Sequence, residues 1–243
     1  SLSGPLLGDR IFFVVNGRFN NFDGWLRGVN RFTPANIAYT DSAGNFILNR
    51  DGASTLGDGK VVNMNSSRKI YGQGKLTFRV MEGVKFWYQY IHDDVEYQDY
   101  NSFFVFNPDG NATNHRIGQT HLAQLTHVLS NSTFYTAGFS LFKKDFRRSV
   151  FDSMNDPGYV HPNLLLQATP YSFSTGGVDM GWFNRSTTTM VGKADFTSQV
   201  TQQHLVKAGV QFSSHELYYN SITLRPVEAQ TEIVLAKDSP YIQ

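Results

Sequence analysis

The chain has 243 residues, and its 21 Lys and Arg against 20 Asp and Glu give a formal net charge of +1, so charge offers no basis for binding nucleic acid. Charged residues make up 17% of the chain, against about 25% in an average soluble domain. Aromatic residues make up 14%, which excludes a disordered chain, because they bury enough apolar surface to offset chain entropy. The longest apolar runs, such as 11–15, are far shorter than the roughly 20 residues of a membrane-spanning helix.

The absence of Cys excludes disulfides, thiolate metal sites and Cys nucleophiles. The chain opens Ser-Leu-Ser-Gly-Pro, without an initiator Met or a signal peptide. We therefore expect it to be a piece of a longer protein.

Alternation with a period of two residues runs through nearly every patterned stretch, which predicts an all-β fold. In the clearest case Ile70, Leu76, Phe78 and Val80 share one face of a strand with two glycines. Four hairpins are expected, in chain order: 1–6 with 10–20, 70–80 with 84–90, 115–129 with 133–150, and 187–200 with 204–219. The phase of 115–129 stays open, because both of its faces are mixed.

The connections alternate strictly between short and long. Turns of about three residues join the strands of a hairpin, whereas the hairpins are separated by 21–68, 99–114 and 151–186. An up-and-down sheet then carries all its tight turns on one rim and all its long loops on the other. That asymmetry is typical of an antiparallel transmembrane β-barrel in the bacterial outer membrane, with short periplasmic turns and long extracellular loops.

The mixed face of the strands is predicted to line the lumen of this barrel. It carries Lys75, Arg79, Lys85, Lys193, Asp195 and Lys207. A narrow, dry eight-stranded interior would need a carboxylate for each cation, so the surplus of cations favours a wider lumen. Eight strands then form an incomplete barrel, whose two open edges would cost on the order of tens of kcal/mol in hydrocarbon unless further strands pair with them.

Two other folds are compatible with the alternation. A soluble secreted β-sandwich that binds carbohydrate, or a β-propeller, shows a similar pattern of strands. The other alternative is a complete eight-stranded outer-membrane barrel that acts as an enzyme or an adhesin.

Several segments together resemble one family. They are 3–6, 10–19, 24–28 and 31–32, then 57–59 and 62–65, 69–79 and 106–110, and finally 132–135 and 193–200. In their order along the chain and their general residue pattern, they are similar to the start of the barrel in TonB-dependent outer-membrane receptors. The subgroup is the one with a carboxypeptidase-regulatory-like domain ahead of the plug.

The resemblance implies a 22-stranded barrel with a plug folded inside it, of which residues 1–243 would form about the first eight strands. It implies import of a scarce nutrient, such as a siderophore or an oligosaccharide, without a cofactor and energised through the TonB complex. The expected partners are outer-membrane lipid, the small-molecule or oligosaccharide ligand, and TonB by way of the plug. The TonB box, the plug and the remaining strands are not in these 243 residues, so this segment is expected to act as part of the wall.

No motif predicts an enzyme. The chain lacks a Gly-x-Ser-x-Gly elbow, a P-loop and a His-Glu-x-x-His sequence. His92, Asp93 and Asp94 are the nearest approach to a metal cluster, but acidic residues of this kind usually belong to solvated turns. We predict neither a catalytic nor a metal site.

Aromatic residues of the long loops are the candidate ligand contacts, since aromatic rings stack on sugars and on aromatic siderophores. They are Phe103, Phe104, Tyr171, Phe173, Trp182 and Phe183. The segment 151–186, rich in Pro, Gly and aromatic residues, is the strongest single candidate. Interface anchoring explains aromatic residues at strand ends equally well.

Overall fold

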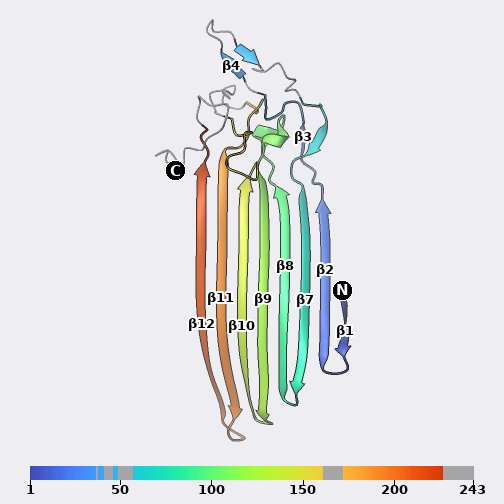
Figure 1. The fold of residues 1–243 in the computed structure, drawn as a ribbon, viewed down its shortest axis with the longest axis vertical. Coiled ribbons are helices and arrows are strands. Elements are labelled where there is room, and N and C mark those ends of the chain that lie inside the picture. Colours follow the sequence, from blue (N-terminus) through green and yellow to red (C-terminus); the bar gives the residue numbers. More distant parts are fainter. Residues whose placement is uncertain (37, 41–45, 49–56, 161–171, 227–243) are drawn as a thin grey trace.

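The computed structural model describes residues 1–36, 38–40, 46–48, 57–160 and 172–226 (Figure 1). Its strands are β1 (Leu2–Leu7), β2 (Ile11–Phe22), β3 (Arg27–Val29), β4 (Ala38–Thr40), β5 (Phe46–Leu48), β6 (Val61–Asn63), β7 (Ser67–Met81), β8 (Val84–Gln98), β9 (Thr113–Ser130), β10 (Thr133–Ser149), β11 (Gly181–Gln199) and β12 (Leu205–Thr223). Two short 3₁₀ helices, η1 (Ser102–Phe104) and η2 (Pro108–Gly110), lie between β8 and β9. None of the helices in the described ranges is long and apolar enough to cross a membrane.

Eight strands form one antiparallel sheet in the order β1-β2-β7-β8-β9-β10-β11-β12. This confirms the predicted all-β fold of about eight strands in four hairpins. The turns 8–10, 82–83, 131–132 and 200–204 lie at one end of the sheet, and the long connections lie at the other (Figure 1).

Three strands are longer than the alternation predicted. β8 runs to Gln98 instead of ending at Tyr90, β11 begins at Gly181 instead of Thr187, and β12 runs on to Thr223. The added residues lie at the loop end, where the face that is apolar near the turns becomes polar, with His92, Asp94 and Glu96 on β8. Ile91, Val95 and Tyr97 lie on the opposite face, so the alternation in 91–98 is out of phase with that of 84–90 and does not extend the predicted strand.

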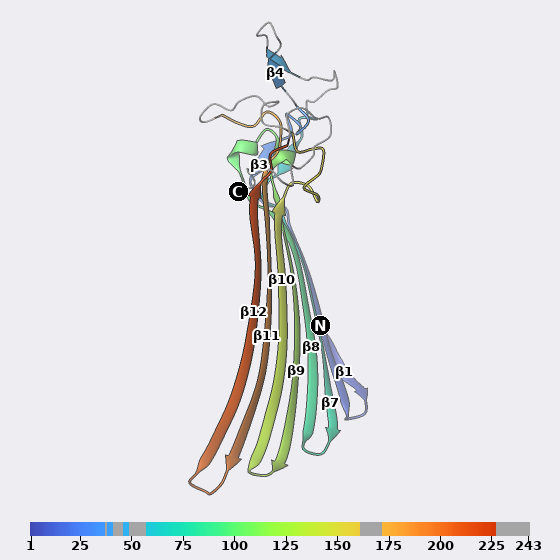
Figure 2. The same ribbon diagram turned by 60° about the vertical axis from the view of Figure 1, so that its left-hand side comes forward.

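The eight-stranded sheet is a single curved layer, as Figure 2 shows. The two other sheets, β3-β6 and β4-β5, have two strands each and lie at the loop end (Figure 1), so within the described residues no second layer covers the eight-stranded sheet and this part of the chain is not a β-sandwich. β1 and β12 are the two edges and do not pair with each other, so the described strands do not form a closed eight-stranded barrel either.

The turn ends are staggered in one direction across the sheet. Ile11, which begins β2, pairs with Phe78, three residues before the end of β7 at Met81. Val84, which begins β8, pairs with His127, three residues before the end of β9 at Ser130. A regular stagger of this kind is what strands tilted relative to a common axis produce.

The buried side chains lie at the loop end of the molecule. A cluster of Tyr159, Val178, Trp182 and Leu224 forms the largest group of buried apolar residues. Along most of the length of the strands, by contrast, large apolar side chains stay exposed, among them Phe139 at 46% and Met190 at 42%.

Candidate functional site

The six residues predicted to line a lumen lie on one face of the sheet, here named the lysine face. The register pairs Lys85 with Thr126, Thr126 with Thr136, and Thr136 with Asp195, so these side chains form one row. Arg79 pairs with Lys85, and Lys75 lies four residues before Arg79 on β7, so it points to the same face. Lys193 lies two residues before Asp195 on β11, and Lys207 pairs with Thr197, two residues after Asp195, so both lysines share this face. That this face borders a lumen stays a prediction.

Neighbouring side chains support the cations on this face. The Lys75 ammonium lies 4.4 Å from the centroid of the Trp87 ring, and the Arg79 guanidinium lies 5.0 Å from that of Phe12. Contacts of this kind stabilise a cation by about 0.5–1 kcal/mol at exposed sites. In the described part of the chain none of the four lysines forms an ion pair. The lysine face therefore presents uncompensated positive charge.

The opposite face, here named the apolar face, divides into two zones. Near the turns it carries the aliphatic and aromatic side chains of Ile11, Phe13, Val15, Leu76, Phe78, Phe86, Tyr88, Ala123, Leu125, Ala137, Phe139, Met190, Ala194, Val210 and Phe212, which share rows of the register. Toward the loops the same face turns polar. The phase of β9 is thereby settled: Ala123 and Leu125 belong to the apolar face, and Gln124 and Thr126 to the lysine face.

The long connections pack against one another above the sheet. We name the described parts of them, residues 23–36, 57–66, 99–112, 150–160 and 172–180, the loop cap. Backbone hydrogen bonds join its segments, including Val29 N to Val105 O at 2.8 Å and Ser174 N to Phe103 O at 2.7 Å. Gly28 allows a close approach, because a Cβ there would lie 2.8 Å from Val105 O.

Asn107 connects two segments of the loop cap from a fully buried position. Its side-chain amide donates to Ser174 Oγ at 3.1 Å and to the carbonyl of Gly177 at 2.8 Å. The sequence Asn-Pro-Asp-Gly at 107–110 is typical of a turn. It forms η2, preceded by a buried side chain, and turn chemistry alone does not indicate that burial.

The predicted ligand contacts separate into different environments. Phe103 and Phe173 are 38% and 46% exposed on the loop cap, whereas Phe104 and Trp182 are buried within it. Tyr171 lies outside the described residues. Phe104 and Trp182 therefore offer no surface to a ligand in this arrangement, and Trp182 belongs to β11 instead of a loop.

A second aromatic group lies on the lysine face just below the loop cap. Phe183 contacts Phe146 and Tyr219, with ring centroids 5.5 Å and 5.2 Å apart, and both pairs meet edge to face. The Arg185 guanidinium lies 5.8 Å from the Phe146 centroid. Rings beside a guanidinium form a surface suited to stacking and to anionic groups.

The exposed ring of Phe173 is held by residues that the sequence did not single out. Phe106 meets Phe173 edge to face at 5.0 Å, and Arg31 lies 5.9 Å from the Phe106 centroid. No sequence signal joins these positions, because they come from three different connections. Metal binding has no candidate in the described ranges, where no group of three or more His, Asp or Glu is arranged to hold an ion.

Two sites in the loop cap have shifted pKa values. Burial raises the pKa of the Tyr159 phenol, which also accepts a hydrogen bond from Phe151 N at 3.4 Å. A hydrogen bond from Lys60 lowers the pKa of Asp58, and Asp58 raises that of Lys60. Both members of the Asp58–Lys60 pair are exposed, so their pairing adds little stability.

The raised pKa of Tyr159 predicts loss of loop-cap stability in alkali. The folded state holds the phenolic proton more tightly than the unfolded state, so its contribution is complete below the ordinary pKa of about 10 and declines as pH rises above it. We expect the melting temperature to fall above about pH 10, and to fall less in Tyr159→Phe. Tyr100→Phe, at an exposed tyrosine, is the control and should behave as wild type. An equal fall in Tyr159→Phe and wild type would contradict the assignment.

No family model, no curated protein and no solved structure matches the chain.

Proposed function

We propose that this chain forms part of the barrel wall of a TonB-dependent transporter in the bacterial outer membrane, importing a scarce nutrient such as a siderophore or an oligosaccharide. The observation that carries the proposal is the uncovered apolar zone on one face of a single-layer sheet whose other face is polar and cationic. Monomeric soluble proteins rarely expose a continuous apolar surface of this extent. A lipid bilayer covers such a surface, and a water-filled lumen solvates the lysine face.

The height of the apolar zone differs between strands. On β7 it extends from Ile70 to Val80, ten steps of about 3.3 Å, or roughly 33 Å along the strand, which a tilt of about 40° reduces to roughly 25 Å along the membrane normal. On β8 it ends at Tyr90, because His92 and Asp94 pair with Gly72 and Ile70. The apolar band of outer-membrane barrels is about 25 Å tall, so β7 matches its full height and β8 matches the part nearer the turns.

The two open edges of the sheet fit a larger barrel. β12 and β1 each present an unpaired row of backbone groups within the described sheet. In hydrocarbon such rows require further strands, because each unsatisfied group costs several kcal/mol. In the 22-stranded receptors that this chain resembles, further strands of the barrel would pair with these two edges.

Fractionation of cells that express the full-length protein tests the proposal. We expect the protein in the outer membrane, partitioning into the detergent phase, and a plug-coding region upstream of these strands with further alternating strands downstream. Recovery in the aqueous phase would refute the membrane assignment. A coding sequence without further strands would refute the large barrel.

Phe103 and Phe173 are the proposed first contacts for the nutrient, since they are the exposed members of the predicted set. We expect Phe103→Ala combined with Phe173→Ala to weaken ligand binding about ten- to hundredfold, as loss of two stacking rings would. Binding is measured by tryptophan fluorescence, with catecholate siderophores and linear oligosaccharides as probes. Tyr100→Ala, at another exposed aromatic residue of the cap, is the control. Equal affinity in the double variant and wild type would remove these residues from the ligand path.

A further inference from the structure

The apolar face carries two hollows on adjoining strands. The lower one, of about 290 Å³, is lined almost wholly by carbon, from Tyr88, His121, Ala123, Phe139 and Leu141. The upper one, of about 410 Å³, lies nearer the loops. We name them the apolar hollow and the polar hollow. Both use β9 and β10, so one elongated molecule can reach both.

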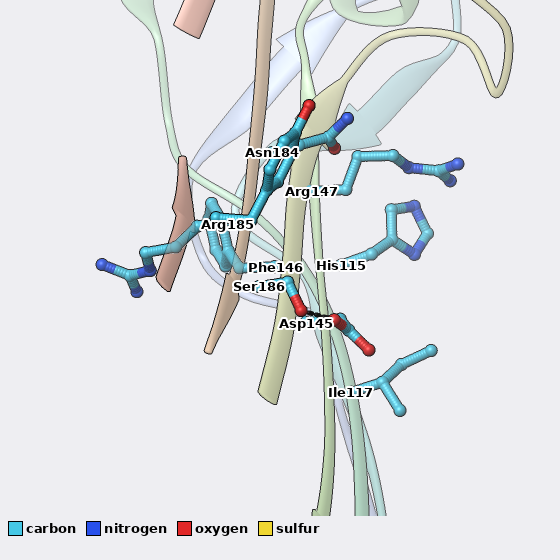
Figure 3. Close-up of a pocket in the computed structure, with 9 residues that line it drawn as sticks. His115, Ile117, Asp145, Phe146, Arg147, Asn184, Arg185 and Ser186 are labelled. Carbon is cyan, nitrogen blue, oxygen red and sulfur yellow. Dashed lines mark hydrogen bonds between the residues drawn. The ribbon is translucent and has the colours of Figure 1, made fainter. Parts of the chain in front are cut away.

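The polar hollow combines hydrogen-bond donors with acceptors. Figure 3 shows His115, Ile117 and Arg147 on one side of the strands, and Phe146 and Arg185 on the other. The carboxylate of Asp145 lies at the centre of the site and accepts a hydrogen bond from Ser186 Oγ at 2.6 Å. Tyr218 adds an exposed ring at the margin.

Arg147 has unused hydrogen-bonding capacity. Its Nη2 atom pairs with Asp152, but its Nε atom is buried and has no hydrogen-bond partner within the described residues. A buried donor without a partner is costly, and a ligand that accepts from it removes the cost.

This mixture of groups fits hydroxyls better than phosphate. A hydroxyl both donates and accepts, and so can satisfy a carboxylate and a guanidinium together, whereas a phosphate only accepts. The nearby Asp145 and Glu96 carboxylates oppose an anion, and His115 lies 3.7 Å from Glu96. The polar hollow is therefore suited to a saccharide.

The spacing of the two hollows fits one amphiphilic molecule. Leu141 and Asp145 are four residues apart on β10, about 13 Å along the strand. At a tilt of about 40° this is roughly 10 Å along the membrane normal, so a molecule with its acyl chain in the apolar hollow carries its headgroup at the level of the polar hollow.

We propose that the two hollows bind one glycolipid of the outer leaflet, with an acyl chain in the apolar hollow and its saccharide headgroup in the polar hollow. This rests on the proposed membrane function, because it requires the apolar face to contact lipid on the loop side.

The test uses the full-length protein purified from outer membranes in a mild detergent, with bound lipid measured by mass spectrometry. Ser186→Trp fills the polar hollow, and Ser214→Trp places the same side chain on the same face of β12, outside both hollows. We expect lipopolysaccharide bound per protein to fall about tenfold in Ser186→Trp and to stay at the wild-type level in Ser214→Trp. Reconstitution in phosphatidylglycerol vesicles with and without lipopolysaccharide should show retention of lipopolysaccharide over phosphatidylglycerol by wild type and Ser214→Trp, but not by Ser186→Trp.

Equal lipopolysaccharide in wild type and Ser186→Trp, with both proteins in the membrane, would overturn the glycolipid site while leaving the membrane assignment intact. Equal retention of phosphatidylglycerol would also overturn it, because the polar hollow would then not require a saccharide headgroup. Absence of the protein from the membrane fraction would overturn both proposals together.

Discussion

Replacing Phe139 by Arg is expected to lower the free energy of unfolding in lipid vesicles by about 2–4 kcal/mol, the cost of placing a cationic side chain near the bilayer midplane on the lipid side of a barrel. Phe139 lies in the middle of the apolar zone, in a row with Tyr88, Ala123 and Gly192. An Arg at this depth can reach water only by extending its side chain toward the interface.

The neighbouring residue provides a matched control. Ser140 is on the same strand at almost the same depth, but its side chain belongs to the lysine face. It pairs with Leu122 on one side and Val191 on the other, and these pair in turn with Gln89 and Ser213. Ser140→Arg should change the free energy of unfolding by less than about 1 kcal/mol, because the new cation stays in water. The measurement is a denaturant titration of the full-length protein refolded into vesicles. A larger loss in Ser140→Arg than in Phe139→Arg would mean that the lysine face contacts lipid, and equal small losses would place neither face in the bilayer.

The strands could be predicted from sequence where one face is apolar and the other polar. That contrast identified β7 and the four hairpins, and it placed Lys75 and Arg79 opposite Leu76 and Phe78. It failed where the two faces exchange character, as at 91–98 of β8, which carries His92, Asp94 and Glu96 on the face that is apolar nearer the turns. The local sequence pattern therefore predicts a strand only where its two faces keep different surroundings along its length.

The loop cap could not be predicted in this way, because its contacts join residues far apart in the sequence. The aromatic residues of the candidate site were found by composition, but composition does not distinguish the exposed Phe103 from the buried Phe104 beside it. The difference comes from the way η1 packs on the other segments of the cap. Asn107 and Arg31 were missed for the same reason, since their partners belong to other connections.

Asn107 gives the second large expected effect, because it is the buried polar link between the connection that follows β8 and the one that follows β10. In Asn107→Leu the carbonyl of Gly177 loses the donor that lies 2.8 Å away. An unsatisfied buried acceptor costs about 1–3 kcal/mol. The strands are not weakened by this loss, because their backbone hydrogen bonds are made to neighbouring strands of the sheet. We therefore expect the cap to open locally while the sheet stays folded.

Hydrogen exchange can measure that local loosening. The backbone N–H groups of Ser174 and Gly177 donate to Phe103 O at 2.7 Å and Pro34 O at 2.9 Å, so they report on contacts between segments of the cap. In Asn107→Leu we expect their exchange to accelerate about ten- to hundredfold, in proportion to the lost free energy. Asp109→Leu changes an exposed residue of the same connection and should leave both rates unchanged. Equal acceleration in β9 and β10 would show that cap and sheet open together, and unchanged rates at Ser174 and Gly177 would show that the backbone bonds hold the cap without Asn107.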